Sequence, residues 1–145
     1  MQSRSLSLFR VISTDYSSYL SVLFPIVFGV FSLYFFFAGN DAVRLFLPLA
    51  IAVTVIGVPI LIRRYRTISS VLVDGEQTKG EITGIGFFRG RGVVKYSYIF
   101  HGERHASDNA INKNGRTRKL KVGQKVTVLV DPKDPKRAFI QEIYL

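Results

Sequence analysis

The chain has 145 residues, which is room for one ordinary domain or for a membrane anchor with a small domain. Hydrophobic residues make up 48% of it and gather in the first 62 residues, whereas most of the formal net charge of +10 follows them, so the two parts face different solvents. The absence of cysteine excludes disulfides, thiolate metal sites and cysteine nucleophiles.

Residues 1–18 form the first segment, which carries Arg4 and Arg10 among serines and apolar residues. Leu6, Phe9 and Ile12 recur at threefold spacing, as on a short helix lying in the lipid headgroup region. A partly ordered cytoplasmic tail fits the composition equally well, and both interpretations stay open.

Residues 19–66 are predicted to form a transmembrane helical hairpin with spans at about 19–38 and 45–63. No charged residue occurs between Tyr16 and Asn40, and none occurs in the eighteen residues 45–62. A cleaved signal peptide is disfavoured because the first apolar run is too long and a second follows directly. The connector is short, so the two spans must be antiparallel.

The flanking charges predict the orientation of the hairpin. Arg4 and Arg10 precede the first span, and an arginine cluster at residues 63–66 follows the second, whereas the connector has only Arg44 beside Asp41. The positive-inside rule therefore predicts that both termini are cytoplasmic.

Two sets of residues in the spans are predicted to pack helices together. One is a phenylalanine stripe on one helical face, and the other is a row of small residues that permits close approach. The sets are Phe24, Phe28, Phe31 and Phe35, and Ala50, Thr54 and Gly57. Contact with lipid is the alternative for both sets, and a flat hydrophobic ligand is a further alternative for the stripe.

Residues 67–145 are predicted to form a small cytoplasmic β-domain, since the apolar period changes from helical to alternating. Strands are expected at 78–88, 93–101, 104–111, 125–130 and 138–144. The predicted fold class is an α+β membrane protein: a two-helix transmembrane hairpin followed by a five-stranded antiparallel β-barrel of the OB or SH3 type, or a sandwich.

No catalytic, cofactor or metal site is predicted. His101 and His105 lie near Glu103 and Asp108, but their spacing matches no zinc pattern. No nucleophile elbow or pair of catalytic carboxylates is visible, so the chain is predicted not to be an enzyme, with no cofactor and no small-molecule substrate.

The basic residues are the predicted contact surface for anionic lipid or a protein partner, each contributing on the order of 1 kcal/mol near a charged leaflet. They are Arg63, Arg64, Arg66, Lys113, Arg116, Arg118, Lys119 and Lys121. Nucleic acid is a rival ligand because small barrels bind strands with basic loops and aromatic rings. It is disfavoured because Tyr96, Tyr98 and Phe100 are needed for the core.

Five stretches after the apolar helices carry a resemblance to a known family. They are Gly-x-Ile-Thr-Gly at 80–84, Val-Lys-Tyr-Ser-Tyr at 94–98, His-Gly-Glu at 101–103, Val-Gly-Gln-Lys-Val-Thr-Val at 122–128 and Asp-Pro-Lys-Asp-Pro at 131–135. Residues 67–145 resemble the bacterial membrane-protein family called domain of unknown function 3592. The resemblance implies a small β-domain tethered to membrane helices, with no established activity, substrate or catalytic residues.

The expected function is that of a non-enzymatic accessory or interaction subunit in the bacterial inner (plasma) membrane. The chain would be multi-pass with both termini cytoplasmic, and its β-domain would dock a protein partner or the anionic membrane surface. A membrane-embedded immunity protein that antagonises a toxin is the first alternative. A membrane-tethered nucleic-acid binder is the second.

Overall fold

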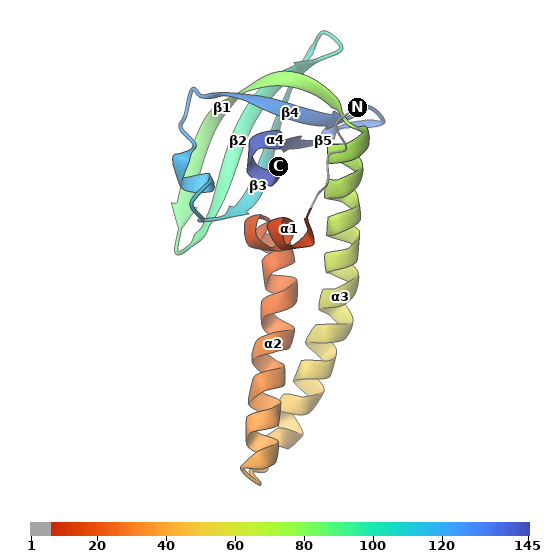
Figure 1. The fold of residues 1–145 in the computed structure, drawn as a ribbon, viewed down its shortest axis with the longest axis vertical. Helices are drawn as coiled ribbons and strands as arrows, with labels where there is room; N and C mark the ends of the chain where they lie inside the picture. Colours follow the sequence, from red (N-terminus) through yellow and green to blue (C-terminus); the bar gives the residue numbers. More distant parts are fainter. Residues whose placement is uncertain (1–6) are drawn as a thin grey trace.

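The computed structural model describes residues 7–145, so Arg4 and Leu6 of the expected first segment lie outside the described residues. A short helix, α1 (Leu8–Thr14), lies across the start of a long helix, α2 (Tyr16–Phe37). Helix α3 (Val43–Asp74) returns beside α2 and continues upward to the sheet (Figure 1). The first segment therefore contains a helix over its second half.

Both long helices are long and apolar enough to cross a membrane, by length and composition. They have 22 and 32 residues with mean hydropathies of 2.2 and 2.7 in their most apolar windows. Apolar side chains such as Val30, Phe36 and Val55 are exposed on their outer faces. At 1.5 Å per residue α3 is about 48 Å long, which exceeds the thickness of about 30 Å of a bilayer's hydrocarbon core.

The rest of the chain forms an antiparallel five-stranded sheet with the order β3-β2-β1-β4-β5. Its strands are β1 (Glu76–Phe88), β2 (Arg91–Phe100), β3 (Glu103–Asn112), β4 (Lys125–Asp131) and β5 (Asp134–Ile140). A 3-10 turn, η1 (Thr117–Lys119), lies between β3 and β4. The first four predicted strands are confirmed to within two residues at each end.

The sheet curls into a nearly closed barrel. The first half of β1 pairs with β4 and its second half with β2, and a bulge between Ile82 and Gly84 bends the strand. The alternating directions make the two edge strands, β3 and β5, parallel where they approach each other. The Asn109 amide of β3 donates to the Ala138 carbonyl of β5 at 3.3 Å and joins the edges, and the Tyr96 hydroxyl of β2 donates to the same carbonyl at 2.6 Å.

The predicted last strand, 138–144, is wrong at both ends. Strand β5 begins four residues earlier, after a turn in which Asp131 accepts a hydrogen bond from the Lys133 amide. It stops at Ile140, and a one-turn helix, α4 (Gln141–Tyr144), follows. Helical spacing buries both Ile143 and Tyr144 in the mouth of the barrel, which an extended chain would not do.

One core joins the sheet to the helices. Alternate residues of β2 from Val94 to Phe100 point inward, as the alternation predicts. Ile68 and Leu72 from the end of α3 and Val11 from α1 are fully buried in the same cluster. The sheet is therefore packed against the helices and is not joined to them by a linker alone.

Candidate functional site at the junction of the helices and the sheet

Asp15 stands where α1 ends and α2 begins, and it is completely buried. Its carboxylate caps α2 by accepting hydrogen bonds from the Ser18 amide at 2.9 Å and the Ser18 hydroxyl at 2.8 Å. Its backbone forms an isolated antiparallel bridge with Ile111 of β3. Asp15 therefore fixes the start of α2 to the edge of the sheet.

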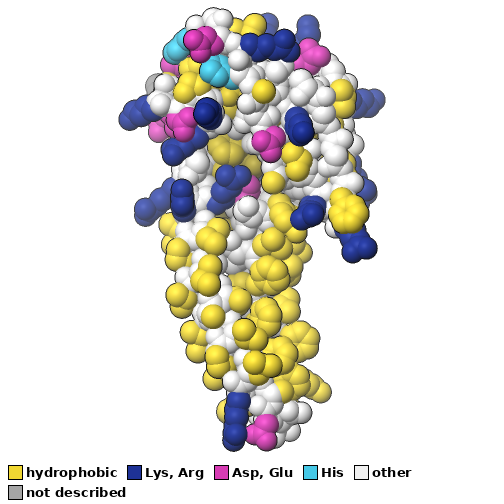
Figure 2. Space-filling view, turned by 180° about the vertical axis from the view of Figure 1, so that it is seen from behind, with side chains coloured by type: hydrophobic (Ala, Val, Ile, Leu, Met, Phe, Trp, Pro, Cys, Tyr) yellow, Lys and Arg dark blue, Asp and Glu magenta, His cyan; other side chains and the backbone are white. Residues whose placement is uncertain are grey.

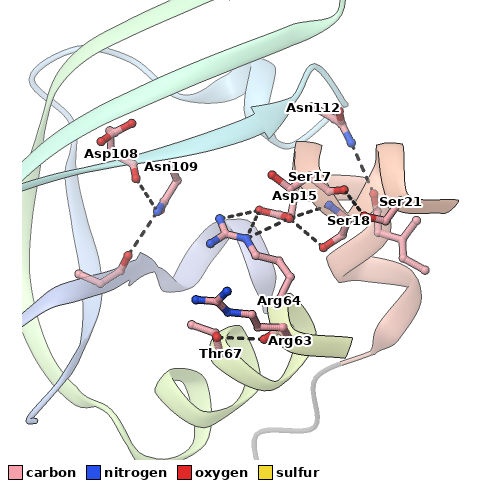
Figure 3. A network of polar contacts seen from close by, with 12 residues as sticks. Asp15, Ser17, Ser18, Ser21, Arg63, Arg64, Thr67, Asp108, Asn109 and Asn112 are labelled. Atoms are coloured by element: carbon pink, nitrogen blue, oxygen red, sulfur yellow. Dashed lines mark hydrogen bonds and ion pairs between the residues drawn. The ribbon is translucent and has the colours of Figure 1, made fainter. Parts of the chain in front are cut away.

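Arg64 reaches the same carboxylate from α3 (Figure 3). Its Nη2 and Nε donate to Asp15 Oδ1 at 2.9 and 3.1 Å, and Nε also lies 3.2 Å from Oδ2. The guanidinium carbon is 5.8 Å from the centre of the Phe139 ring of β5. Burial alone would lower the pKa of Arg64, but the hydrogen bonds and charge of Asp15 raise it. One ion pair thus ties together α2, α3 and two strands.

Further bonds hold α1 against the loop after β3. The side-chain amides of Asn112 and Asn114 donate to the Ser13 carbonyl at 3.2 and 3.3 Å. On the neighbouring hairpin of β1 and β2, the Arg91 guanidinium lies 5.9 Å from the centre of the Tyr16 ring. The sheet is thereby fastened to the start of α2 on two sides.

An open pocket of about 510 Å³ lies beside the ion pair, between the end of α3, the start of α2 and the edges of β3 and β5. Most of its charged lining is cationic, and Asp108 of β3 supplies the one carboxylate among the described residues that line it. The cations are Arg63, Arg64, Lys136 and Arg137. Arg137 is already paired with Asp134 at 3.2 Å and with Asp131 at 3.9 Å.

Other cations surround the same end of the hairpin. Arg10, Arg116 and Lys119 line a second open pocket, of about 520 Å³, between α1 and the loop after β3. Arg89 and Lys113 line a third, of about 480 Å³, beside the first turns of α2. Lysine and arginine side chains border the apolar surface of the helices in Figure 2. Together they form a cationic belt where the apolar surface stops.

A family model for the domain of unknown function DUF3592 matches residues 67–142, more than half of the chain. The chain belongs to the DUF3592 family. No curated protein and no solved structure matches it. The matched residues include the whole DUF3592 sheet and the last turns of α3, whereas Asp15 and Arg64 lie outside them. The expected resemblance is confirmed.

The predicted basic residues fall into two groups around the DUF3592 domain. Arg63 and Arg64 line the pocket between β3 and β5. Arg66 follows them within one turn of α3, and its side chain is exposed. The other group lies in the loop after β3 and is exposed: Lys113, Arg116, Arg118, Lys119 and Lys121. Within the part of the chain that the structure describes, Arg64 is the one member of the first group that pairs with a buried carboxylate.

The phenylalanine stripe lies partly between the helices. Phe28, Phe31 and Phe35 surround Phe46 of α3, with ring centres 6.1, 5.5 and 5.0 Å from it. Phe24, the fourth member, is 47% exposed, and Phe31 is 46% exposed although its ring packs on Phe46. The stripe therefore contributes both to the helix contact and to the outer face.

The small-residue row also splits. Ala50 and Gly57 are buried, and a Cβ added to Gly57 would lie 2.7 Å from the Ser21 carbonyl oxygen of α2. Thr54 is exposed, and its hydroxyl donates to the Ala50 carbonyl of its own helix at 2.7 Å. The backbones of the two helices therefore approach each other closely at Gly57.

The two histidines lie away from the junction. His101 occupies the turn between β2 and β3 with φ of 49°, and its Nε2 is 3.5 Å from a Glu76 oxygen. His105 lies 3.9 Å from Glu103. Residues 7–145 contain no cluster of three or more histidine, cysteine or acidic side chains that could hold a metal ion.

Several junction residues were not predicted from the sequence. Lys136 and Arg137 follow a proline-flanked turn and resemble ordinary surface residues. Asp15 carried a usable signal, because an aspartate at the head of an apolar helical run is a common helix N-cap. Its pairing with Arg64, 49 residues away, left no local signal.

Proposed function

We propose that this DUF3592 protein is a multi-pass protein of the bacterial inner membrane with both termini in the cytoplasm. Two helices of sufficient length and hydropathy support the insertion. The cationic belt surrounds one end of the hairpin, whereas the connecting turn at the other end has a single, exposed Arg44–Asp41 pair. This asymmetry favours a cytoplasmic DUF3592 domain.

We further propose that it acts as a non-enzymatic accessory subunit whose DUF3592 domain docks on the anionic leaflet. The cationic belt is the observation that carries this proposal. Because the sheet shares a core with α1 and α3, it is held close to the headgroups, where each cation contributes on the order of 1 kcal/mol, reduced by salt. Among small barrels, the bulged β1 and the parallel approach of β3 and β5 favour the OB type.

The orientation is tested by cysteine labelling, since the natural chain has no cysteine. Asn40→Cys places a thiol in the connecting turn, and Lys133→Cys places one on an exposed turn of the sheet. A membrane-impermeant maleimide applied to intact spheroplasts should label the first variant, and the second only after permeabilisation. The reverse pattern would contradict the proposed orientation.

The docking is tested by hydrogen exchange of the full chain in nanodiscs. Amides of residues 113–121 should exchange more slowly in discs containing phosphatidylglycerol than in phosphatidylcholine discs, and 0.5 M salt should abolish the difference. Equal exchange in both lipids at low salt would refute docking on anionic lipid.

The accessory role is tested by purification in mild detergent followed by mass spectrometry. A stoichiometric protein partner is the expected result. A strictly monomeric chain that carries no protein partner would contradict the accessory role and leave the topology untouched.

A further inference from the structure

The pocket between β3 and β5 spans the change from apolar to polar surroundings. Ile60, 45% exposed, lies on its lining toward the apolar part of α3, and Arg63 follows one turn later on the same helix. The opposite wall is made by two strand edges that form no ladder with each other in the described chain. A molecule in this pocket would therefore meet an apolar surface on one side and polar groups on the other.

The charges of the pocket divide into paired and free ones. Arg64 is neutralised by Asp15, and Arg137 by the carboxylates of the β4–β5 turn. Among the described residues, Arg63 and Lys136 have no acidic partner within ion-pair distance, and Asp108 has no basic partner. The unpaired lining thus consists of two cations, Arg63 and Lys136, and one carboxylate, Asp108. Two cations that no carboxylate pairs can both donate hydrogen bonds to one anionic phosphodiester.

The size of the pocket is also suitable. A volume of about 510 Å³ lies within the range of about 300–1,000 Å³ that is typical of small-molecule sites. Its entrance is open, so a ligand can occupy it while a long apolar part stays outside. Arginine and lysine both bind phosphate oxygens with charge-assisted hydrogen bonds.

We propose that this pocket binds the headgroup of one membrane glycerophospholipid, with its phosphodiester between Arg63 and Lys136 and its glycerol backbone toward Ile60. The inference rests on the proposed membrane insertion and deepens it, because it names a single bound lipid rather than a diffuse charged surface. A free phosphate compound shares the phosphate chemistry but lacks the part that would contact Ile60.

The test is native mass spectrometry of the full chain in detergent, titrated with dioctanoyl phosphatidylglycerol. The wild-type chain should bind one lipid saturably. Arg63→Gln combined with Lys136→Gln should weaken this binding at least tenfold. The matched control, Arg66→Gln with Lys133→Gln, removes the same charge from exposed positions outside the pocket and should change the affinity less than twofold.

Two results would overturn the proposal: no saturable one-lipid binding by the wild-type chain, or equal weakening in both double variants. A competition experiment with glycerol phosphate tests whether the pocket binds a free phosphate compound instead. Glycerol phosphate at tenfold excess should fail to displace the lipid. Displacement by equimolar glycerol phosphate would overturn the assignment to a lipid.

Hydrogen exchange of residues 113–121 in anionic nanodiscs, measured on the same variants, separates this inference from the proposed docking. Protection that persists in the pocket variant while its one-lipid binding is lost supports the pocket as a separate site. Protection without any one-lipid binding by the wild-type chain overturns the pocket and leaves the docking standing. One-lipid binding without protection overturns the docking and leaves the pocket standing.

Discussion

Replacing either partner of the Asp15–Arg64 pair should destabilise the protein, and by unequal amounts. Arg64→Gln leaves a fully buried carboxylate with only the two Ser18 donors. Loss of one partner from a buried pair costs about 3–5 kcal/mol, and because the Arg64 side chain is 31% exposed we reduce this to about 2–4 kcal/mol. Asp15→Asn keeps an N-cap and leaves a guanidinium that water can reach, so about 1–2 kcal/mol is expected.

The measurement is urea-induced unfolding of the full chain in detergent, followed by near-ultraviolet circular dichroism of the tyrosines. Arg66→Gln, on the exposed side of the same helix, is the control and should change the free energy of unfolding by less than about 0.5 kcal/mol. In the double variant the buried charge is gone, so its loss should be smaller than the sum of the two single losses. Strict additivity, or a larger loss for Asp15→Asn than for Arg64→Gln, would refute the proposed role of the pair.

Further substitutions test the packing. Gly57→Ala should destabilise the hairpin by about 1–3 kcal/mol in the same unfolding assay, since the new Cβ meets Ser21, whereas Gly29→Ala, with open space, should be neutral or stabilising. Tyr144→Phe removes a buried hydroxyl that has no hydrogen-bond partner among residues 7–145 and should stabilise by about 1 kcal/mol, whereas Tyr96→Phe loses a hydrogen bond and should destabilise by a similar amount. Burial raises the pKa of both tyrosines above 10, so their contribution to the free energy of unfolding should be constant well below pH 10. Above pH 10 stability should fall, and less steeply when both tyrosines are replaced by phenylalanine. If stability falls equally steeply above pH 10 in this double variant and in the wild-type chain, the two buried tyrosines do not cause the fall.

The parts of the fold that follow from local patterns could be predicted from the sequence. The two long apolar helices follow from the length of the uncharged runs, and the first four strands follow from alternation, as in Val94, Tyr96 and Tyr98. The prediction of the last strand failed because the spacing of its apolar residues fits both a strand and a helix. Ile140, Ile143 and Tyr144 are spaced as on one helical face, and their packing inside the barrel selects the helix.

The candidate pocket could not be predicted, because its lining comes from four elements. Ile60 and Arg63 are close in sequence, but Asp108 and Lys136 join them only through the register of β3 and β5 at the open edge of the barrel. Two edge strands that approach each other without pairing have no residue pattern by which the sequence could reveal their proximity. The basic residues were visible as a set, whereas their division between two sides of the hairpin depends on the loop after β3.

Arg63 and Arg64 show why the charge count alone is an incomplete guide to this junction. The positive-inside rule counts them equally, yet successive residues on a helix point about 100° apart. That rotation directs Arg64 to the buried carboxylate of Asp15, and Arg63 projects from the same helix without reaching it (Figure 3). The charge of Arg64 is therefore neutralised in a stabilising ion pair, whereas the charge of Arg63 is not. The ion pair also fixes α3 against β5, so that the charge of Arg63 faces the pocket beside Lys136.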